Sequence, residues 1–175
     1  RALLVLIGFN LKLVTVDRKI LEDSVLPSLE DKNEGKFILN VGANWYTKSY
    51  ASIFKKNKYI ELEIDWWRFQ FCSSDTNIHA DFLNLPSCFE FDYIILNGVF
   101  GRGINSNKQI EQAVQVCNNC LVTNGIILLG DKNKNLEFPI HLFSGLGFRD
   151  ITDFLVEKTL NTYKKHKFVA LAKQV

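Results

Sequence analysis

The sequence predicts an α/β fold in which a mostly parallel β-sheet carries helices on both faces. Apolar segments of strand length alternate with segments of helical periodicity through most of the 175 residues. Alternation of this kind is typical of a parallel sheet covered by helices. One segment, residues 91–98, is continuously apolar at its centre, as expected of a strand that is buried on both faces. The length of the chain favours one domain with its own core.

Each predicted element follows from its local pattern. Short apolar runs indicate strands over residues 37–41, 59–64, 77–81, 91–98 and 123–130, the last entered through a turn at Asn124 and Gly125. Helical spacing predicts helices over 47–56, 107–121 and 139–146. Two C-terminal segments are expected to pair as an antiparallel hairpin across a basic turn, namely 151–158 and 167–173. Residues 1–35 are predicted to form an N-terminal helical cap with a break near Pro27, which leaves 36–175 as the core.

Composition limits the classes of partner. The chain is 47% hydrophobic and 23% charged with a net charge of +2, so no strong field attracts a polyanion. The apolar residues 1–9 are too few to span a bilayer, Lys12 soon interrupts them, and no small-residue cleavage site follows. We therefore expect a partner that is neither nucleic acid nor membrane.

The 4 cysteines include one C-x-x-C pair, Cys117 and Cys120. This pair closes a predicted helix, where the helix dipole disfavours the thiolate that a redox pair needs. Cys72 and Cys88 are too widely separated to form a second C-x-x-C, so no metal site is predicted. Reduced, partly buried thiols are expected, and they favour a cytoplasmic location.

Polar residues follow the ends of three predicted strands, where ligands bind in sheets of this kind. Gly42 ends the first strand, and the absence of a Cβ lets the backbone approach a ligand. Glu63 and Asp65 lie roughly 20 residues further on, a spacing that suits a carboxylate bound to ribose hydroxyls. After the third strand, Asp81 is placed to accept from an adenine amino group. The next residue, Phe82, would offer its N–H to a ring nitrogen and its side chain to the base.

The sequence resembles the class I S-adenosylmethionine-dependent methyltransferases in the order of five motifs. They are ILNVGAN, LEID, IHADFLNLP, FDYIILNGVF and CLVTNGIILLG. The resemblance covers residues 36–173. It implies a Rossmann-like three-layer sandwich, with a mostly parallel seven-stranded sheet and an antiparallel C-terminal strand. It also implies S-adenosylmethionine as the cofactor. NWYTKSY and NGVFGRG resemble a small bacterial subgroup of the same superfamily.

The resemblance gives a role to each matching residue. Gly42 and Ala43 would lie against the methionine part of the cofactor, and Asn97 and Gly98 would border the methionine and the transferable methyl group. The ribose and adenine residues would be Glu63 with Asp65 as second candidate, and Asp81 with Phe82.

The glycine-rich turn of the family is altered in this chain. The family's G-x-G-x-G becomes GANWY, so Asn44 stands where a glycine is usual, and Asn tolerates a left-handed backbone better than most residues. Trp45 or Tyr46 would either face a sulfonium, an attraction worth about 1–2 kcal/mol when desolvated, or cover the core.

The function implied by the resemblance is methyl transfer to a small-molecule or sugar acceptor. Alignment of the acceptor would supply much of the catalysis, so neither a protein nucleophile nor a general base is nominated, and the oligomeric state is left open. The glycines of residues 97–103 permit a mobile loop over the site, with Arg102 placed for an anionic acceptor. Nucleic acid is not expected as the acceptor, because there is no basic face and LNGV stands where amino-directed nucleic-acid methyltransferases carry DPPY.

Two other functions fit parts of the sequence. GANWYTKS misses the phosphate-loop pattern only at Thr47, and Lys48 and Ser49 would then contact phosphate and magnesium. Thr47 lacks the backbone freedom that such a loop demands, and the strand over residues 91–98 ends without an aspartate for the metal. The second alternative is a non-catalytic, methyltransferase-like binding module, because little sequence remains for a separate substrate domain.

Overall fold

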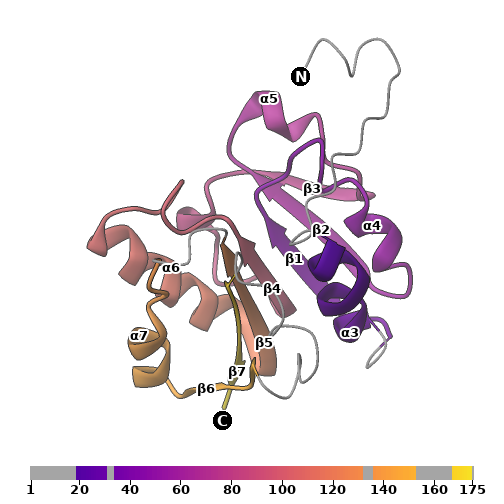
Figure 1. Ribbon diagram of the computed structural model, residues 1–175. Coiled ribbons are helices and arrows are strands. Elements are labelled where there is room, and N and C mark those ends of the chain that lie inside the picture. Colours follow the sequence, from indigo (N-terminus) through magenta and orange to yellow (C-terminus); the bar gives the residue numbers. More distant parts are fainter. Residues whose placement is uncertain (1–18, 31–33, 132–135, 153–166, 175) are drawn as a thin grey trace.

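The sheet has seven strands in the order β3-β2-β1-β4-β5-β7-β6 (Figure 1). The computed structural model of the protein describes residues 19–30, 34–131, 136–152 and 167–174. β1 (Phe37–Val41) is an interior strand and pairs in parallel with both β2 (Lys58–Glu63) and β4 (Phe91–Asn97). β3 (Thr76–His79) extends the sheet beside β2, and β5 (Leu121–Asp131) extends it beside β4. The predicted fold class, including its parallel core, is confirmed.

The C-terminal strand is antiparallel, as expected. β7 (Lys167–Lys173) pairs with β5 on one side and with β6 (Phe148–Asp150) on the other. Among the described residues, β6 is the partner of β7 on this side, and it directly precedes the predicted segment 151–158, of which residues 153–158 lie outside the described residues. Only the start of that segment is described, where the N–H of Ile151 donates to the carbonyl of Ala170 at 2.8 Å.

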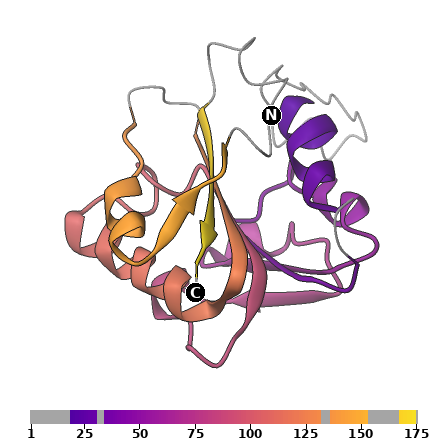
Figure 2. The same cartoon turned by 90° about the horizontal axis from the view of Figure 1, so that it is seen from below.

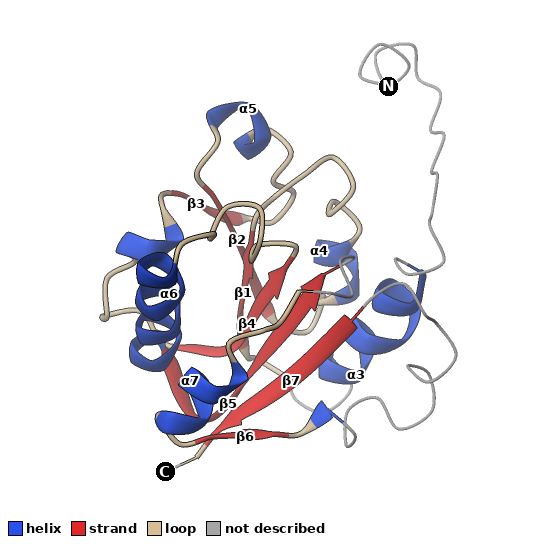
Figure 3. Ribbon diagram, turned by 60° about the vertical axis from the view of Figure 1, so that its left-hand side comes forward, coloured by secondary structure: helices blue, strands red, loops and turns tan. Residues whose placement is uncertain are grey.

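Helices cover both faces of the sheet (Figures 2 and 3). α6 (Asn107–Cys120) and α7 (Ile140–Gly145) lie on one face, where their buried residues join strand residues in one core cluster. The N-terminal helices and α4 (Tyr50–Ile53) lie on the other face and form a second cluster. Alternate residues of each strand supply the two clusters, because successive side chains point to opposite faces. The result is the predicted three-layer sandwich.

The N-terminal helix does not break at Pro27. A π-helical turn, η1 (Leu21–Val25), runs directly into α3 (Leu26–Glu30). Pro27 is the second residue of α3 and comes directly after the change from π-helical to α-helical geometry, so the irregularity expected near this proline takes the form of a π-turn within a continuous helix. Residues 1–18 of the predicted cap lie outside the described residues.

Two predicted helices have the expected ends and one is much shorter. A capping box at Ser106 and Gln109 begins α6, and α7 is followed by Gly147 with a φ of +83°. α4 covers only four of the ten residues predicted for it, because residues 45–49 form turns instead. Two short helices were not predicted, α5 (Trp66–Phe69) and η2 (Phe82–Asn84). None of the helices among the described residues has both the length and the hydropathy to cross a bilayer.

Candidate active site

The carboxyl ends of the parallel strands share one edge of the sheet because their registers are aligned. Glu63, the last residue of β2, pairs with His79 of β3, and Asn97, the last residue of β4, pairs with Gly130 of β5. β1 ends at Val41 between β2 and β4. Neighbouring strands are about 4.8 Å apart, so the residues that follow them lie close together. The structure thus brings the predicted strand-end residues to one edge, at the point where the strand order reverses.

The turn after β1 is closed by its own hydrogen bonds. Gly42 has a φ of +91°, its N–H donates to the Leu62 carbonyl at 2.8 Å, and nothing lies within 4 Å of the position where a Cβ would be. The N–H of Asn44 donates to Thr47 Oγ1 at 3.0 Å, and that hydroxyl donates back to the Asn44 carbonyl at 2.9 Å. The N–H of Trp45 donates to Asn44 Oδ1 at 2.9 Å. Asn and Thr side chains therefore stabilise a turn that is usually built from glycines, while Gly42 keeps an open approach.

This turn is not arranged as a phosphate loop. The N–H of Gly42 is bonded to the Leu62 carbonyl, and the N–H groups of Asn44, Trp45 and Thr47 are bonded within the turn, so these groups do not converge on a phosphate. Lys48 Nζ lies 5.7 Å from the centroid of the Phe71 ring, and Ser49 Oγ donates to Glu22 Oε1 at 3.0 Å. The two residues that a phosphate loop needs are therefore turned to other partners.

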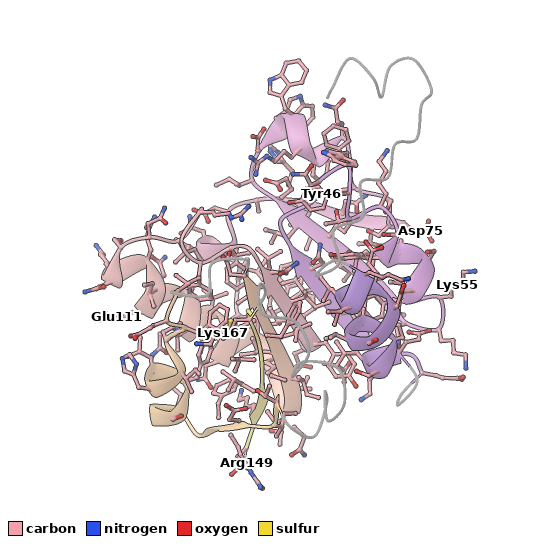
Figure 4. All side chains as sticks on the ribbon, viewed as in Figure 1. Tyr46, Lys55, Asp75, Glu111, Arg149 and Lys167 are labelled. Carbon is pink, nitrogen blue, oxygen red and sulfur yellow. The ribbon has the colours of Figure 1, made fainter. Side chains whose placement is uncertain are left out.

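Trp45 and Tyr46 remain at the surface. Their rings meet edge to face with centroids 5.5 Å apart, and their side chains are 41% and 37% exposed. Tyr46 lies at the same end of the molecule as α5 (Figure 4). Of the two predictions for these rings, covering the core is wrong, and contact with a sulfonium stays a prediction.

Glu61 and Glu63 are both buried on the same face of β2, but their surroundings differ. Glu61 Oε2 accepts hydrogen bonds from the backbone N–H groups of Ser73 and Ser74, and the side chain is fully buried. Glu63 is 3% exposed, and its Oε1 accepts from the N–H of Asp65 at 2.8 Å. No residue in the described part of the chain donates to Glu63 Oε2. Glu63 therefore retains an oxygen for a ligand.

Asp65 serves as the N-cap of α5. Its Oδ1 accepts from the N–H of Trp67 at 2.9 Å, and its Oδ2 lies 3.7 Å from Arg68 Nε. Because both oxygens already have local partners, Asp65 is less suited than Glu63 to hold a ribose. The helix that Asp65 begins leaves Trp66 and Trp67 68% and 76% exposed, which the sequence did not predict.

Asp81 caps the short helix η2 after β3. Its Oδ1 accepts from the N–H of Leu83 at 2.9 Å and its Oδ2 from Asn84 Nδ2 at 3.3 Å. A carboxylate oxygen has a second lone pair, so a further bond to an adenine amino group stays a prediction. The ring of Phe82 is 4% exposed and packs in the core, so the predicted contact of this side chain with the base is wrong. Only the backbone N–H of Phe82 remains a candidate.

At the end of β4, Asn97 and Gly98 lie against β5. A Cβ on Gly130 would stand 2.5 Å from Asn97 Oδ1, so only glycine fits there, and the N–H of Gly98 donates to the Gly130 carbonyl. The next residue, Asp131, is 3% exposed, and its Oδ2 would be 3.9 Å from a Cβ on Gly98. The sequence carried the signal for Asp131, a carboxylate directly after an apolar strand, which is the signal that identified Glu63.

The turn over residues 98–104 is compact. The Val99 carbonyl accepts from the N–H groups of Gly103 at 3.0 Å and Ile104 at 3.1 Å, and Gly101 donates to the Ile104 carbonyl at 2.9 Å. Phe100 and Ile104 are buried. A mobile loop was predicted here from the glycines, but the structure shows a hydrogen-bonded turn with two buried anchors.

The cysteines and His79 have structural surroundings. Burial raises the pKa of the Cys117 thiol, and burial also raises the pKa of Cys120, so neither is poised as a thiolate. All four thiols are free, and Cys88 is exposed. His79 Nε2 lies 3.1 Å from the Ile64 carbonyl, so its ring contacts the backbone of the fold.

Comparison with known proteins identifies the fold. The N-methyltransferase NodS from Bradyrhizobium japonicum WM9, in complex with S-adenosyl-L-homocysteine, matches with a TM-score of 0.69 over 94% of this chain and 91% of that chain, at 10% sequence identity. This chain has the class I methyltransferase fold. Magnesium protoporphyrin IX methyltransferase (ChlM) from Synechocystis PCC 6803, with bound S-adenosylmethionine, matches with a TM-score of 0.64 at 12% identity and covers 91% of this chain and 81% of that chain.

A protein with another named activity also shares this fold. The [4+2]-cyclase SpnF matches with a TM-score of 0.61 at 11% identity, over 90% of this chain and 81% of that chain. No family model and no curated protein matches this sequence. At these identities the likeness establishes the fold, and the chemistry has to be argued from the site.

Proposed function

We propose that the protein catalyses S-adenosylmethionine-dependent methyl transfer to a small-molecule or sugar acceptor. A single domain would do this, with residues 36–175 as the cofactor-binding core and residues 1–35 as a cap. The observation that carries the proposal is Glu63, whose carboxylate is buried at the end of β2 and keeps one oxygen to which no described residue donates. A carboxylate oxygen that the protein leaves without a donor at the end of a strand can accept from the hydroxyl groups of a ligand.

The residues at the strand ends fit the parts of this cofactor. Glu63 would accept from the ribose hydroxyls, while Asp81 and the Phe82 N–H would meet the adenine edge. When bound, the cofactor supplies an electrophilic methyl group on a sulfonium. The residues along its methionine end would be Gly42, Ala43 and Asn44 after β1, and Asn97 and Gly98 after β4. The positive φ of Gly42 and Gly98 supports close backbone approach at both places.

The protein would contribute to catalysis by binding and aligning the two substrates. The backbone after β4 would hold the acceptor so that its nucleophilic atom faces the methyl group, which is an efficient use of binding energy. The S-adenosylhomocysteine in the NodS structure and the S-adenosylmethionine in the ChlM structure support the cofactor part of the proposal. Neither nucleic acid nor a membrane is proposed as partner, and the free thiols fit a cytoplasmic location.

A second candidate is a methyltransferase-like protein that binds the cofactor or another ligand without transferring a methyl group. Two observations favour it. The turn after β1 carries Asn44 and Tyr46 where glycines are usual, and a cyclase is among the proteins with this fold. Turnover separates the two candidates.

Isothermal titration calorimetry with S-adenosylmethionine, S-adenosylhomocysteine and magnesium-ATP tests the proposal. We expect the first two to bind and ATP not to bind. Glu63→Ala should weaken binding of S-adenosylhomocysteine by about 1–3 kcal/mol through lost hydrogen bonds to a charged group. Glu111→Ala, at an exposed glutamate on α6, is the matched control and should leave binding unchanged.

Each result of the titration has a distinct meaning. Failure of both sulfur ligands to bind would overturn the proposal, and heat from magnesium-ATP alone would favour the phosphate loop. Binding without S-adenosylhomocysteine production, across a panel of small-molecule and sugar acceptors, would favour the binding module.

A further inference from the structure

In the proposed arrangement, the carboxyl ends of β4 and β5, beyond Gly98, are not needed to hold the adenosyl group. If Glu63 and Asp81 hold that group over β2 and β3, the methyl end points across β1 toward β4. The acceptor must then lie over the ends of β4 and β5, which are hydrogen-bonded neighbours in the sheet. This inference rests on the proposed function and concerns the acceptor alone.

A cation is fixed at this part of the edge. Arg102 lies in the compact turn after β4, and its Nε is 3.8 Å from Asp131 Oδ2, as an ion pair. The side chain of Asp131 is 4% exposed and that of Arg102 is 59% exposed. Among the described residues, Asp131 is the one partner that forms an ion pair or hydrogen bond with the guanidinium. A buried carboxylate therefore engages the Nε edge of the guanidinium, while much of the side chain faces solvent.

The carboxylate of Asp131 also places the guanidinium of Arg102 near the predicted position of the methyl group. Asp131 Oδ2 would be 3.9 Å from a Cβ on Gly98, the residue proposed to border that group. The turn is braced by the buried Phe100 and Ile104 on either side of Arg102. The position of Arg102 is thus set by the fold and does not depend on a ligand.

A second cation among the described residues lies on the neighbouring strand β7. Lys167 is the β7 partner of Asp131 in the sheet register, and its Nζ lies 5.5 Å from the centroid of the Phe138 ring. Among the described residues, Arg102 and Lys167 therefore bring positive charge to the region around Asp131, which favours an anionic acceptor.

We propose that Arg102 binds a carboxylate group of the methyl acceptor, with Asp131 as the positioning residue that holds the guanidinium and Lys167 adding to the positive field. The planar guanidinium matches a carboxylate in two-point geometry, and such bonds are about twice as strong as neutral ones. The carboxylate is planar, like the guanidinium, whereas a phosphate is tetrahedral. The acceptor class is therefore a small carboxylic acid, and a phosphate-bearing acceptor is the rival outcome.

NMR titration of the full chain tests this proposal with defined probes. The ¹⁵N-labelled protein, with and without S-adenosylhomocysteine, is titrated at constant ionic strength with malonate, with neutral malonamide and with inorganic phosphate. We expect malonate to shift the Arg102 Nε–H resonance and to bind more tightly than the other two. Arg102→Gln should weaken malonate binding about tenfold, and Arg102→Lys, which keeps the charge and loses the planar fork, by less.

Arg149→Gln is the matched control, because Arg149 is exposed on β6 (Figure 4) and pairs with Ala172, the partner of Ile126 within β5, whereas Asp131 ends β5. It should leave the malonate affinity unchanged, and thermal melting checks that each variant is folded. Equal responses to malonate and malonamide, or unchanged malonate affinity in Arg102→Gln, would overturn the proposal. Tighter binding of phosphate than of malonate would replace a carboxylate acceptor with a phosphorylated one. Loss of S-adenosylhomocysteine binding, with the malonate response intact, would instead defeat the proposed function and leave an anion site without this acceptor role.

Discussion

The middle and the carboxyl end of β2 each carry a buried glutamate, and the two differ in what donates to them. Glu61, in the middle, is held by the backbone N–H groups of Ser73 and Ser74 and has Thr47 Oγ1 at 3.4 Å. Glu63, two residues further on, has one donor in the described part of the chain, the N–H of Asp65. The comparison teaches that burial of a carboxylate does not by itself indicate a ligand site. The number of protein donors around the carboxylate decides.

The largest effect expected from this comparison is on stability. Glu61→Ala removes the acceptor of two backbone N–H groups and should lower the free energy of unfolding by about 3–5 kcal/mol. Glu63→Ala should lower it by less than about 1 kcal/mol, because it removes one partner of the Asp65 N–H near the surface. Urea denaturation followed by circular dichroism measures both. Equal losses in the two variants would show that the two carboxylates have the same role.

The second-largest effect is expected from replacing each glutamate by glutamine, which tests the difference between Glu61 and Glu63 more closely. Glu63→Gln keeps the size of the side chain but removes its charge, and it should weaken S-adenosylhomocysteine binding by about 1–2 kcal/mol with little change in stability. Glu61→Gln should do the reverse, because its amide N–H groups face backbone donors. Titration calorimetry and denaturation on both variants measure this. A loss of affinity in Glu61→Gln as large as in Glu63→Gln, in protein shown to be folded, would contradict the assignment of the ligand to the strand end.

Much of the fold could be predicted because its strands are marked by local apolar runs. β1 has the predicted bounds, β2 begins and ends one residue earlier than predicted, and β4 ends one residue earlier than predicted. The helix predicted over residues 47–56 is mostly absent because Asn44 and Thr47 bond to each other's backbone and side chain. Such side chains compete with helix formation. α5 was missed because WWRF has no helical period and its Trp residues are exposed, contrary to what apolar residues predict.

The site was predictable as far as strand ends could be located in the sequence. Glu63 and Asp81 could be found by spacing alone, and Asp131 could have been found in the same way. What spacing cannot give is the partner of each carboxylate, since Ser73 reaches Glu61 from 12 residues away. The distinction between Glu61 and Glu63 therefore required coordinates, as did the ion pair between Asp131 and Arg102.

The smallest effect provides the most local test of the comparison. Cys72 lies in the segment that Glu61 holds, and burial raises the pKa of its thiol to about 12, with the negative charges of Glu61 and Glu63 adding to the increase. Because the folded pKa is raised, the neutral thiol contributes stability that is fully present below its ordinary pKa of about 8.5. That contribution is lost as the pH rises through the folded value.

Removal of the Glu63 charge should lower the pKa of Cys72 and speed its alkylation. In Glu63→Gln we expect iodoacetamide to modify Cys72 about two- to threefold faster at pH 8.5 than in the unsubstituted protein, since a nearby charge at the protein surface acts through an intermediate dielectric. Peptide mass spectrometry gives the rate, and the exposed Cys88 is an internal control whose rate should not change. Glu61→Gln should accelerate Cys72 more, because Glu61 ranks ahead of Glu63 among the charges that raise its pKa. If the alkylation rate of Cys72 changes in neither variant, the charges of Glu61 and Glu63 do not influence the Cys72 thiol.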